Sequence, residues 1–83
     1  MELPLTALKD NESGIIKSIK ASSRGVRGWG FHKRLMDMGL IPGTRVTVVK
    51  SAPFHGPVEV SVKGSRLALG RGMAERIIVE INS

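Results

Sequence analysis

The stretch FHKRLMDMGLIPGTRVTVV, residues 31–49, decides the fold that the rest of the chain must accommodate. Its apolar residues Phe31, Leu35 and Met38 recur at the spacing of one helical face, so the first part predicts a short helix. Gly39 follows where a helix commonly ends, because glycine adopts the left-handed backbone of that position without a Cβ clash. The stretch therefore begins as a helix with a sharp stop at Gly39.

After this helix the pattern changes from helix to strand. Leu40 is expected to pack back on Leu35, the hydrophobic contact of a Schellman ending. Pro42 and Gly43 suit the two central positions of a type II turn, since proline fixes φ at the first and glycine accepts a positive φ at the second. Residues 45–49, RVTVV, then alternate with period two, which predicts a strand.

Short β-rich runs separated by turn residues predict the other strands. An apolar lead-in around Pro4 suits an edge strand, because proline lacks the backbone N–H of a central one. The other predicted strands are residues 14–21, 45–50, 58–63, 66–70 and 76–81. Between them lie predicted turns at residues 9–14, 52–57 and 63–66, a Gly- and Arg-rich loop at residues 22–30, and one helical turn at residues 70–75. About five or six short strands, with one short helix after the second, predict a small all-β barrel.

Length and composition limit the classes of protein to which the chain can belong. The chain of 83 residues suffices for a single domain, residues 1–83, and leaves little room for a deep enzyme cleft. No apolar run approaches the roughly 18 residues that cross a bilayer, and the acidic N-terminus does not resemble a signal peptide, so we expect a cytoplasmic protein. The absence of cysteine excludes a disulfide framework and a Cys nucleophile.

The net charge of +6 favours acidic partners such as nucleic acid, anionic lipid or an acidic protein surface. The lysines and arginines are dispersed along the whole chain, however. The solvated surface of a basic domain explains them equally well.

The sequence lacks the motifs of an enzyme. The glycine pairs in residues 28–30 and 70–72 begin a dinucleotide-binding fingerprint, but Lys33 and Glu75 stand where its third glycine belongs. None of the serines lies in a G-x-S-x-G elbow. We therefore expect no enzymatic activity and no required cofactor.

His32 and His55, the only histidines, are weak candidates for a divalent metal such as Fe²⁺ or Zn²⁺. Glu59 follows His55 across a predicted turn, and Asp37 follows His32 at a spacing that suits chelation poorly. A divalent-metal-sensing module remains one alternative function. Adventitious binding at an exposed histidine is the other explanation for any metal found there.

A second alternative is a small basic RNA-binding barrel, in which an aromatic ring stacks on a base and cations hold phosphate. Its candidate residues lie in and after the Gly-rich loop: Arg24, Arg27, Trp29, Lys33 and Arg34. A lone tryptophan also commonly anchors a loop to a barrel. The chain contains few aromatic residues and no tyrosine, which disfavours a stacking platform.

The third function is protein binding, because small barrels present loops and grooves to partner segments. Candidate interface residues are Leu40, Ile41 and Pro42 at the helix end, with Pro53 and Phe54 on the neighbouring hairpin tip. Exposed apolar residues that lie close together mark an interface. The alternative is that these residues cap the ends of the barrel.

Residues 34–43, RLMDMGLIPG, resemble the R-L-x-x-M-G-[L/I]-x-P-G signature of the FeoA family. The similarity extends over nearly the whole chain, and the ordered combination is more specific than the signature alone. Supporting positions are Leu5, Gly14, Ile16, residues 53–60 (PFHGPVEV), residues 67–71 (LALGR), Ala74, Ile77 and Val79. The loop at residues 22–30 is longer and richer in Gly and Arg than the shortest family members need.

The resemblance implies an SH3-like β-barrel that serves as an accessory protein of ferrous iron uptake. The implied partner is a membrane Fe²⁺ transporter with a cytoplasmic GTP-binding domain (FeoB-like), which the protein would contact and regulate from the inner face of the membrane. The SH3-like domain also occurs in iron-dependent repressors, but 83 residues leave no room for a helix-turn-helix domain, so we expect no DNA binding.

Overall fold

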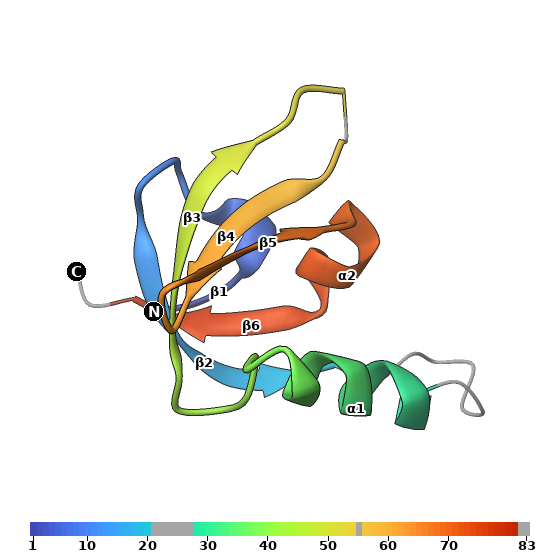
Figure 1. Cartoon of the computed structure of the whole chain (residues 1–83). Coiled ribbons are helices and arrows are strands. Elements are labelled where there is room, and N and C mark those ends of the chain that lie inside the picture. Colours follow the sequence, from blue (N-terminus) through green and yellow to red (C-terminus); the bar gives the residue numbers. More distant parts are fainter. Residues whose placement is uncertain (21–27, 55, 82–83) are drawn as a thin grey trace.

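In the part of the chain that the structure describes, six antiparallel strands form one sheet, which curls into a small barrel (Figure 1). The structure, a computed structural model, describes residues 1–20, 28–54 and 56–81, and for residues 28–32 it describes the backbone alone. In chain order the elements are β1 (Glu2–Pro4), the 3₁₀ helix η1 (Leu5–Ala7), β2 (Ser13–Ile19), α1 (Gly28–Asp37), β3 (Arg45–Ser51), β4 (Val58–Val62), β5 (Ser65–Leu69), α2 (Arg71–Glu75) and β6 (Ile77–Glu80). The predicted all-β fold with one helix after the second strand is confirmed, and the predicted turn at residues 70–75 forms α2.

The end of α1 has the predicted Schellman geometry. Gly39 adopts a φ of +88°, and the N–H of Leu40 donates to the carbonyl of Leu35 at 2.9 Å. The N–H of Gly39 donates to the carbonyl of Met36, also at 2.9 Å. These two bonds satisfy carbonyl groups that the helix end would otherwise leave unpaired. They also turn the Leu40 side chain inward, where it is fully buried.

The predicted type II turn follows directly. Gly43 has a φ of +91°, and the N–H of Thr44 donates to the carbonyl of Ile41 at 3.1 Å. The N–H of Gly43 donates to the carbonyl of Ile16 on β2 at 2.8 Å, so the turn is fixed to the barrel where β3 begins.

The start of α1 differs from the prediction. The periodicity placed the helix from Phe31 onward and assigned residues 22–30 to a loop, but the backbone is already helical at Gly28. The spacing of apolar residues could not predict this earlier start, because residues 28–30 are two glycines on either side of one tryptophan. The rest of that predicted loop, residues 22–27, lies outside the described residues, as does residue 21, the last residue of the predicted strand 14–21.

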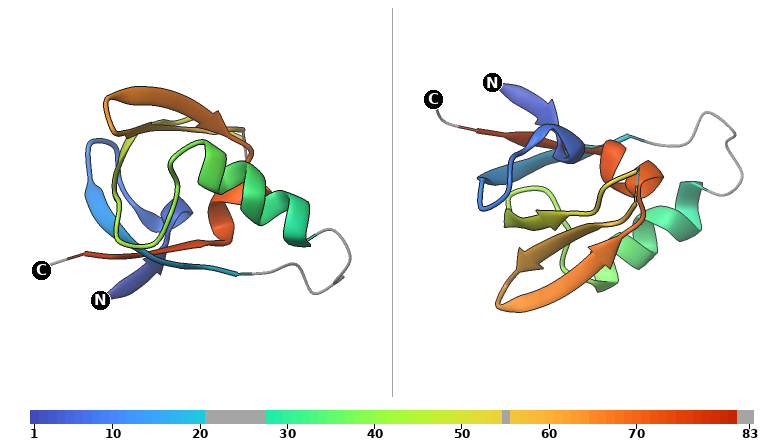
Figure 2. Two further views of the ribbon diagram at one scale, coloured as in Figure 1. Left: turned by 60° about the horizontal axis from the view of Figure 1, so that its bottom comes forward. Right: turned by 90° about the horizontal axis from the view of Figure 1, so that it is seen from above.

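β2 joins the two halves of the barrel, because it pairs with β3 on one side and β6 on the other (Figure 2). The strand order β1-β6-β2-β3-β4-β5 leaves β1 and β5 at the two ends of the sheet. Register shifts in β2 and β3 interrupt the ladders of this sheet. Bulges of this kind increase strand twist and help a sheet to curl.

The core consists of alternate residues of the strands together with residues from η1, α1 and α2. Val58, Val60 and Val62 show the period most clearly, since all three are buried and the residues between them are half-buried. No polar or charged side chain is buried among the residues that the structure describes. Among the residues whose side chains are described, the buried apolar ones are Leu5, Leu8, Ile16, Leu35, Leu40, Val46, Val48, Val58, Val60, Val62, Leu69, Ala74, Ile77 and Val79.

The turn between β4 and β5 is tighter than the predicted four residues. Val62 pairs with Ser65, so only Lys63 and Gly64 form the loop. Both have positive φ, +50° and +81°, as a type I′ hairpin turn requires. β5 consequently begins one residue earlier than predicted, whereas β2 and β6 are each shorter than predicted.

Gly14→Ala is expected to destabilise the fold. A Cβ at Gly14 would lie 3.0 Å from both Cβ and Cγ2 of Val79, inside the core. We expect the free energy of unfolding to fall by about 1–3 kcal/mol in urea denaturation. Gly72→Ala on α2 is the matched control, because no atom lies within 4 Å of its Cβ position. Equal stability of the two variants would contradict the close packing of β2 on β6.

Candidate functional site

The loop between β3 and β4 is tightly folded and carries the most exposed apolar side chain of the described residues. We define the hairpin loop as residues 52–54 and 56–57. The N–H of Ala52 donates to the carbonyl of Pro57 at 3.0 Å, and the N–H of Gly56 donates to the carbonyl of Pro53 at 3.2 Å. A Cβ on Gly56 would lie only 2.8 Å from the Ala52 Cβ. These contacts fix the backbone that presents the tip.

Arg71, at the start of α2, holds the hairpin loop from the side. Its Nε donates to the carbonyl of Gly56 at 3.2 Å, and its Nη2 donates to the carbonyl of Ala52 at 3.3 Å. Both bonds are partly buried, so water competes with them less than at an open surface. Sequence reasoning did not identify this role, because the acceptors are backbone carbonyls 19 and 15 residues earlier in the chain.

Phe54 occupies a position that folding alone does not favour. Its side chain is 96% exposed, and its backbone has a φ of +57°. A bulky residue in the left-handed region costs about 1–2 kcal/mol, and an exposed ring recovers none of this through burial. Pro53, beside it, is also exposed. Strained backbone that presents an apolar side chain to solvent is characteristic of functional positions.

The predicted interface is not one patch. Leu40 is completely buried, so the prediction that it is a partly exposed interface residue is wrong, and substitution there would perturb the core. Ile41 is half-buried and Pro42 is exposed, but both precede β3, whereas the hairpin tip follows it (Figure 1). The seven residues of β3 span roughly 23 Å at about 3.3 Å per residue. The two predicted halves therefore lie at opposite ends of the barrel.

The two histidines predicted to bind metal lie mostly outside what the structure describes. His55 is not described, and of His32 only the helical backbone is. Among the residues that the structure describes, no three of His, Asp or Glu come together to hold a metal ion. Binding of Fe²⁺ or Zn²⁺ at these histidines stays a prediction.

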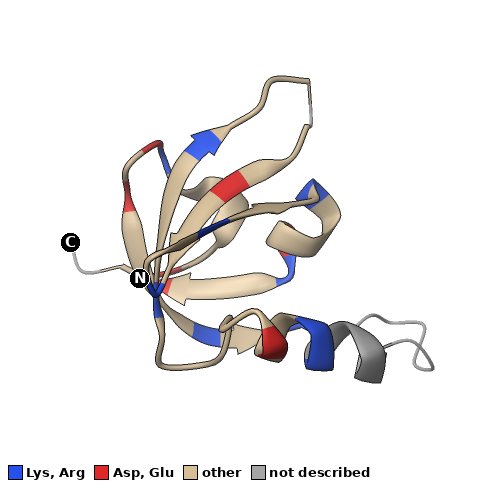
Figure 3. Ribbon diagram, viewed as in Figure 1, with Lys and Arg blue, Asp and Glu red and all other residues tan. Residues whose placement is uncertain are grey.

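The predicted nucleic-acid residues are also only partly described. Arg24 and Arg27 lie outside the described residues, and Trp29 is described by its backbone alone. Lys33 and Arg34 are exposed on α1. Figure 3 shows the described lysines and arginines on most elements of the fold rather than along a single stripe.

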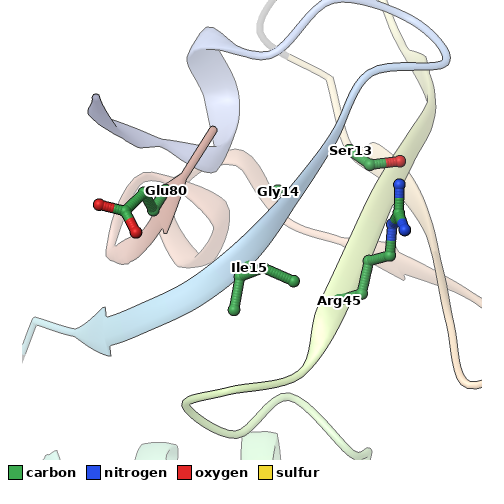
Figure 4. A pocket seen from close by; sticks show the side chains of 5 residues that line it. All are labelled: Ser13, Gly14, Ile15, Arg45 and Glu80. Atoms are coloured by element: carbon green, nitrogen blue, oxygen red, sulfur yellow. The ribbon is translucent and has the colours of Figure 1, made fainter. Parts of the chain in front are cut away.

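A shallow hollow of about 220 Å³ lies between β6, β2 and β3, lined by Ser13, Gly14, Ile15, Arg45 and Glu80 (Figure 4). Its chemistry does not suit catalysis. The Ser13 hydroxyl is hydrogen-bonded to the Thr47 hydroxyl at 2.7 Å rather than to a base. The Glu80 carboxylate lies 3.9 Å from the Lys17 ammonium. Within the described residues this hollow therefore offers no activated nucleophile.

Arg71→Lys is expected to loosen the hairpin loop, because lysine keeps the charge but lacks the planar fork that reaches both carbonyls. The free energy of unfolding should fall by about 1 kcal/mol, and the Ala52 and Gly56 amides should exchange hydrogen faster. Arg66→Lys is the control, since the Arg66 side chain is 72% exposed. Unchanged exchange in Arg71→Lys would show that the loop holds its shape without the arginine.

Comparison with known proteins identifies the family of the chain. Residues 3–81 match the FeoA domain model. An Fe(2+) transport protein A of Methanocaldococcus jannaschii is 40% identical over 77 residues, which are 93% of this chain and 84% of that protein. An Fe(2+) transport protein A/Fe(2+) transporter FeoB fusion protein of Porphyromonas gingivalis is 33% identical over 79 residues, which are 95% of this chain and 9% of the fusion.

The fold comparison agrees. The crystal structure of Stenotrophomonas maltophilia FeoA complexed with zinc, described as a procaryotic SH3 domain protein, superposes with a TM-score of 0.74 at 26% identity. The alignment covers 92% of this chain and 87% of that one, so the predicted SH3-like barrel is confirmed. None of the described helices has the length and apolar character to cross a membrane. The chain belongs to the FeoA family, whose named members here are proteins of ferrous iron transport.

Proposed function

We propose that this protein is a small cytoplasmic accessory protein of ferrous iron uptake. It acts by direct contact with an FeoB-like membrane transporter, on the side that carries the GTP-binding domain, and it catalyses no reaction itself. The fusion protein of P. gingivalis supports this partner, because there a similar domain and the transporter are one polypeptide. Covalent linkage raises the effective concentration of two modules that act together.

The structural observation that carries the proposal is Phe54. A phenylalanine with 96% exposure and a left-handed backbone is worse for folding than glycine or asparagine at the same place. Its presence is explained if the ring is buried in a complex, since aromatic side chains contribute strongly to the centres of protein interfaces. The Arg71 hydrogen bonds support the same role by limiting the conformational freedom that binding would otherwise remove.

Zinc accompanies the S. maltophilia protein in its crystal structure. For this chain we propose that a divalent metal is not required for contact with the transporter. Metal sensing through His32 and His55 stays an alternative function. Metal sensing would raise the free energy of unfolding when metal is added, and this rise would be lost when both histidines are replaced by alanine.

Phe54→Asn is expected to separate binding from stability. Asparagine tolerates a positive φ, so the free energy of unfolding should stay constant or rise by about 1 kcal/mol. Recovery of the FeoB-like transporter from detergent-solubilised membranes of the same source should fall at least severalfold, because the exposed ring is gone. Phe54→Leu, which keeps an apolar side chain, should retain most of the recovery.

Met36→Gln is the matched control, because Met36 is 56% exposed on α1 rather than on the hairpin loop. Recovery of the transporter should survive moderate salt, whereas RNA bound through phosphate contacts would be released steeply as salt rises. Recovery of RNA alone, or equal recovery with Phe54→Asn and the unmodified protein, would contradict the proposed contact.

A further inference from the structure

One edge of the sheet is left open by the fold. β5 is the last strand in the order β1-β6-β2-β3-β4-β5, and among the described elements it pairs only with β4. The opposite edge, β1, is three residues long and contains Pro4, which lacks a backbone N–H. β5 has five residues and no proline. In both views of Figure 2 it lies at the periphery of the barrel, and its residues Ser65, Arg66 and Ala68 are exposed.

The pairing register identifies the backbone groups that face this edge. Val62 and Ser65 flank a two-residue turn, so they form a hydrogen-bonded pair, and pairs alternate along the ladder from there. Ser65, Leu67 and Leu69 consequently bond to β4. Arg66 and Ala68 point their N–H and C=O groups away from β4, and no other described backbone group bonds to them.

β5 carries little of the protection that edge strands usually have. Charged side chains, prolines and bulges commonly prevent an exposed edge from pairing with another strand. The β4–β5 ladder has no register shift. The one charge on β5, Arg66, lies 3.7 Å from the Glu59 carboxylate on the neighbouring strand. The edge is therefore regular, no strand of the described residues covers it, and it is able to accept a further strand.

A second hollow lies on the outer surface beside this edge. It has a volume of about 240 Å³ and is lined by Lys50, Ala52, Pro57, Glu59 and Ala68. Three of these residues have small apolar side chains. A strand paired with β5 would place the residue opposite Ala68 on the same outer face, beside the hollow.

The charge of this side of the barrel indicates which segment fits. Residues 45–69, from β3 to β5, contain four Lys or Arg residues and a single carboxylate, Glu59. Complementary charge favours an acidic partner and disfavours a second copy of the same basic edge. Ala52 and Pro57 also belong to the hairpin loop, so the hollow adjoins the loop that presents Phe54.

We propose that the β5 edge accepts an extended acidic segment of the FeoB-like transporter as a seventh strand, with one apolar side chain seated beside Ala68. This inference rests on the proposed function and names its mode of contact. The N–H and C=O groups of Arg66 and Ala68 bond to the backbone of the segment, and the hollow selects one of its side chains. Phe54 lies beyond the end of the added strand and contacts the transporter separately.

Ala68→Pro tests this pairing, because proline removes an outward N–H without removing a bond to β4. We expect the affinity for the purified, detergent-solubilised transporter to fall by about tenfold or more, since a bond and the strand alignment are both lost. Ala68→Ser, which keeps the N–H and a small side chain, is the matched control and should bind like the unmodified protein. Unfolding curves of both variants establish that the barrel is intact.

Hydrogen exchange provides a test that needs no substitution. In the free protein the Arg66 and Ala68 amides should exchange fast, and those of Ser65, Leu67 and Leu69 slowly. Adding the transporter should slow exchange in the segment 65–69, measured by mass spectrometry. Fast exchange throughout the complex would overturn the inference, and so would slow exchange of both outward amides in the free protein.

The outcomes separate the two proposals. If the transporter binds the unmodified protein and Ala68→Pro equally well, the strand-addition inference fails and the proposed function stands. If the transporter binds neither the unmodified protein nor Ala68→Pro, both the strand-addition inference and the proposed function fail. If protection of the outward amides depends on protein concentration without transporter, the occupant is a second copy of this chain, which overturns the inference.

Discussion

The barrel depends on the close approach of β2 to β6 at Gly14. The position of a Cβ on this residue is only 3.0 Å from two atoms of the Val79 side chain. Because glycine leaves that space empty, β2 can pair with β3 through Gly14 and Val46 and with β6 through Ile16 and Val79. Both halves of the sheet thereby share one core. The β3–β4–β5 side, which carries the hairpin loop and the β5 edge, is joined to the rest of the sheet through β2.

The connection from α1 to β3 shows how local backbone rules serve this arrangement. Positive φ at Gly39 and Gly43 reverses the chain twice within five residues and buries Leu40 between the two reversals. Beyond the far end of β3, by contrast, a positive φ strains the backbone. Phe54 has a positive φ without being glycine, and its side chain is directed to solvent instead of the core. At Gly39 and Gly43 a positive φ causes no Cβ clash, because both residues are glycine. At Phe54 the strain remains, and the hydrogen bonds of Arg71 hold the loop that contains it.

The hairpin loop and the β5 edge complement each other as binding features. The loop offers an aromatic side chain, and the edge offers backbone donors and acceptors that recognise any extended segment. Main-chain pairing supplies affinity with little sequence preference, so selectivity must come from the hollow beside Ala68 and from charge. All of these features lie on the β3–β4–β5 side of the barrel, and the exposed Lys33 and Arg34 lie on α1, at the opposite end from the hairpin tip.

The sequence by itself determined the helix from Phe31 onward, its stop at Gly39, the turn at Gly43, the alternation of the buried valines and the FeoA signature, because each depends on neighbours in the chain. It also marked Pro53 and Phe54 as candidates. It did not determine that β3 separates them from Ile41 and Pro42, nor that Arg71 holds the loop that contains them. It gave no sign that Arg66 and Ala68 face an open edge. Only the tertiary structure decided these points, because they depend on which strands lie side by side, and a local pattern of residues carries no record of its distant neighbours.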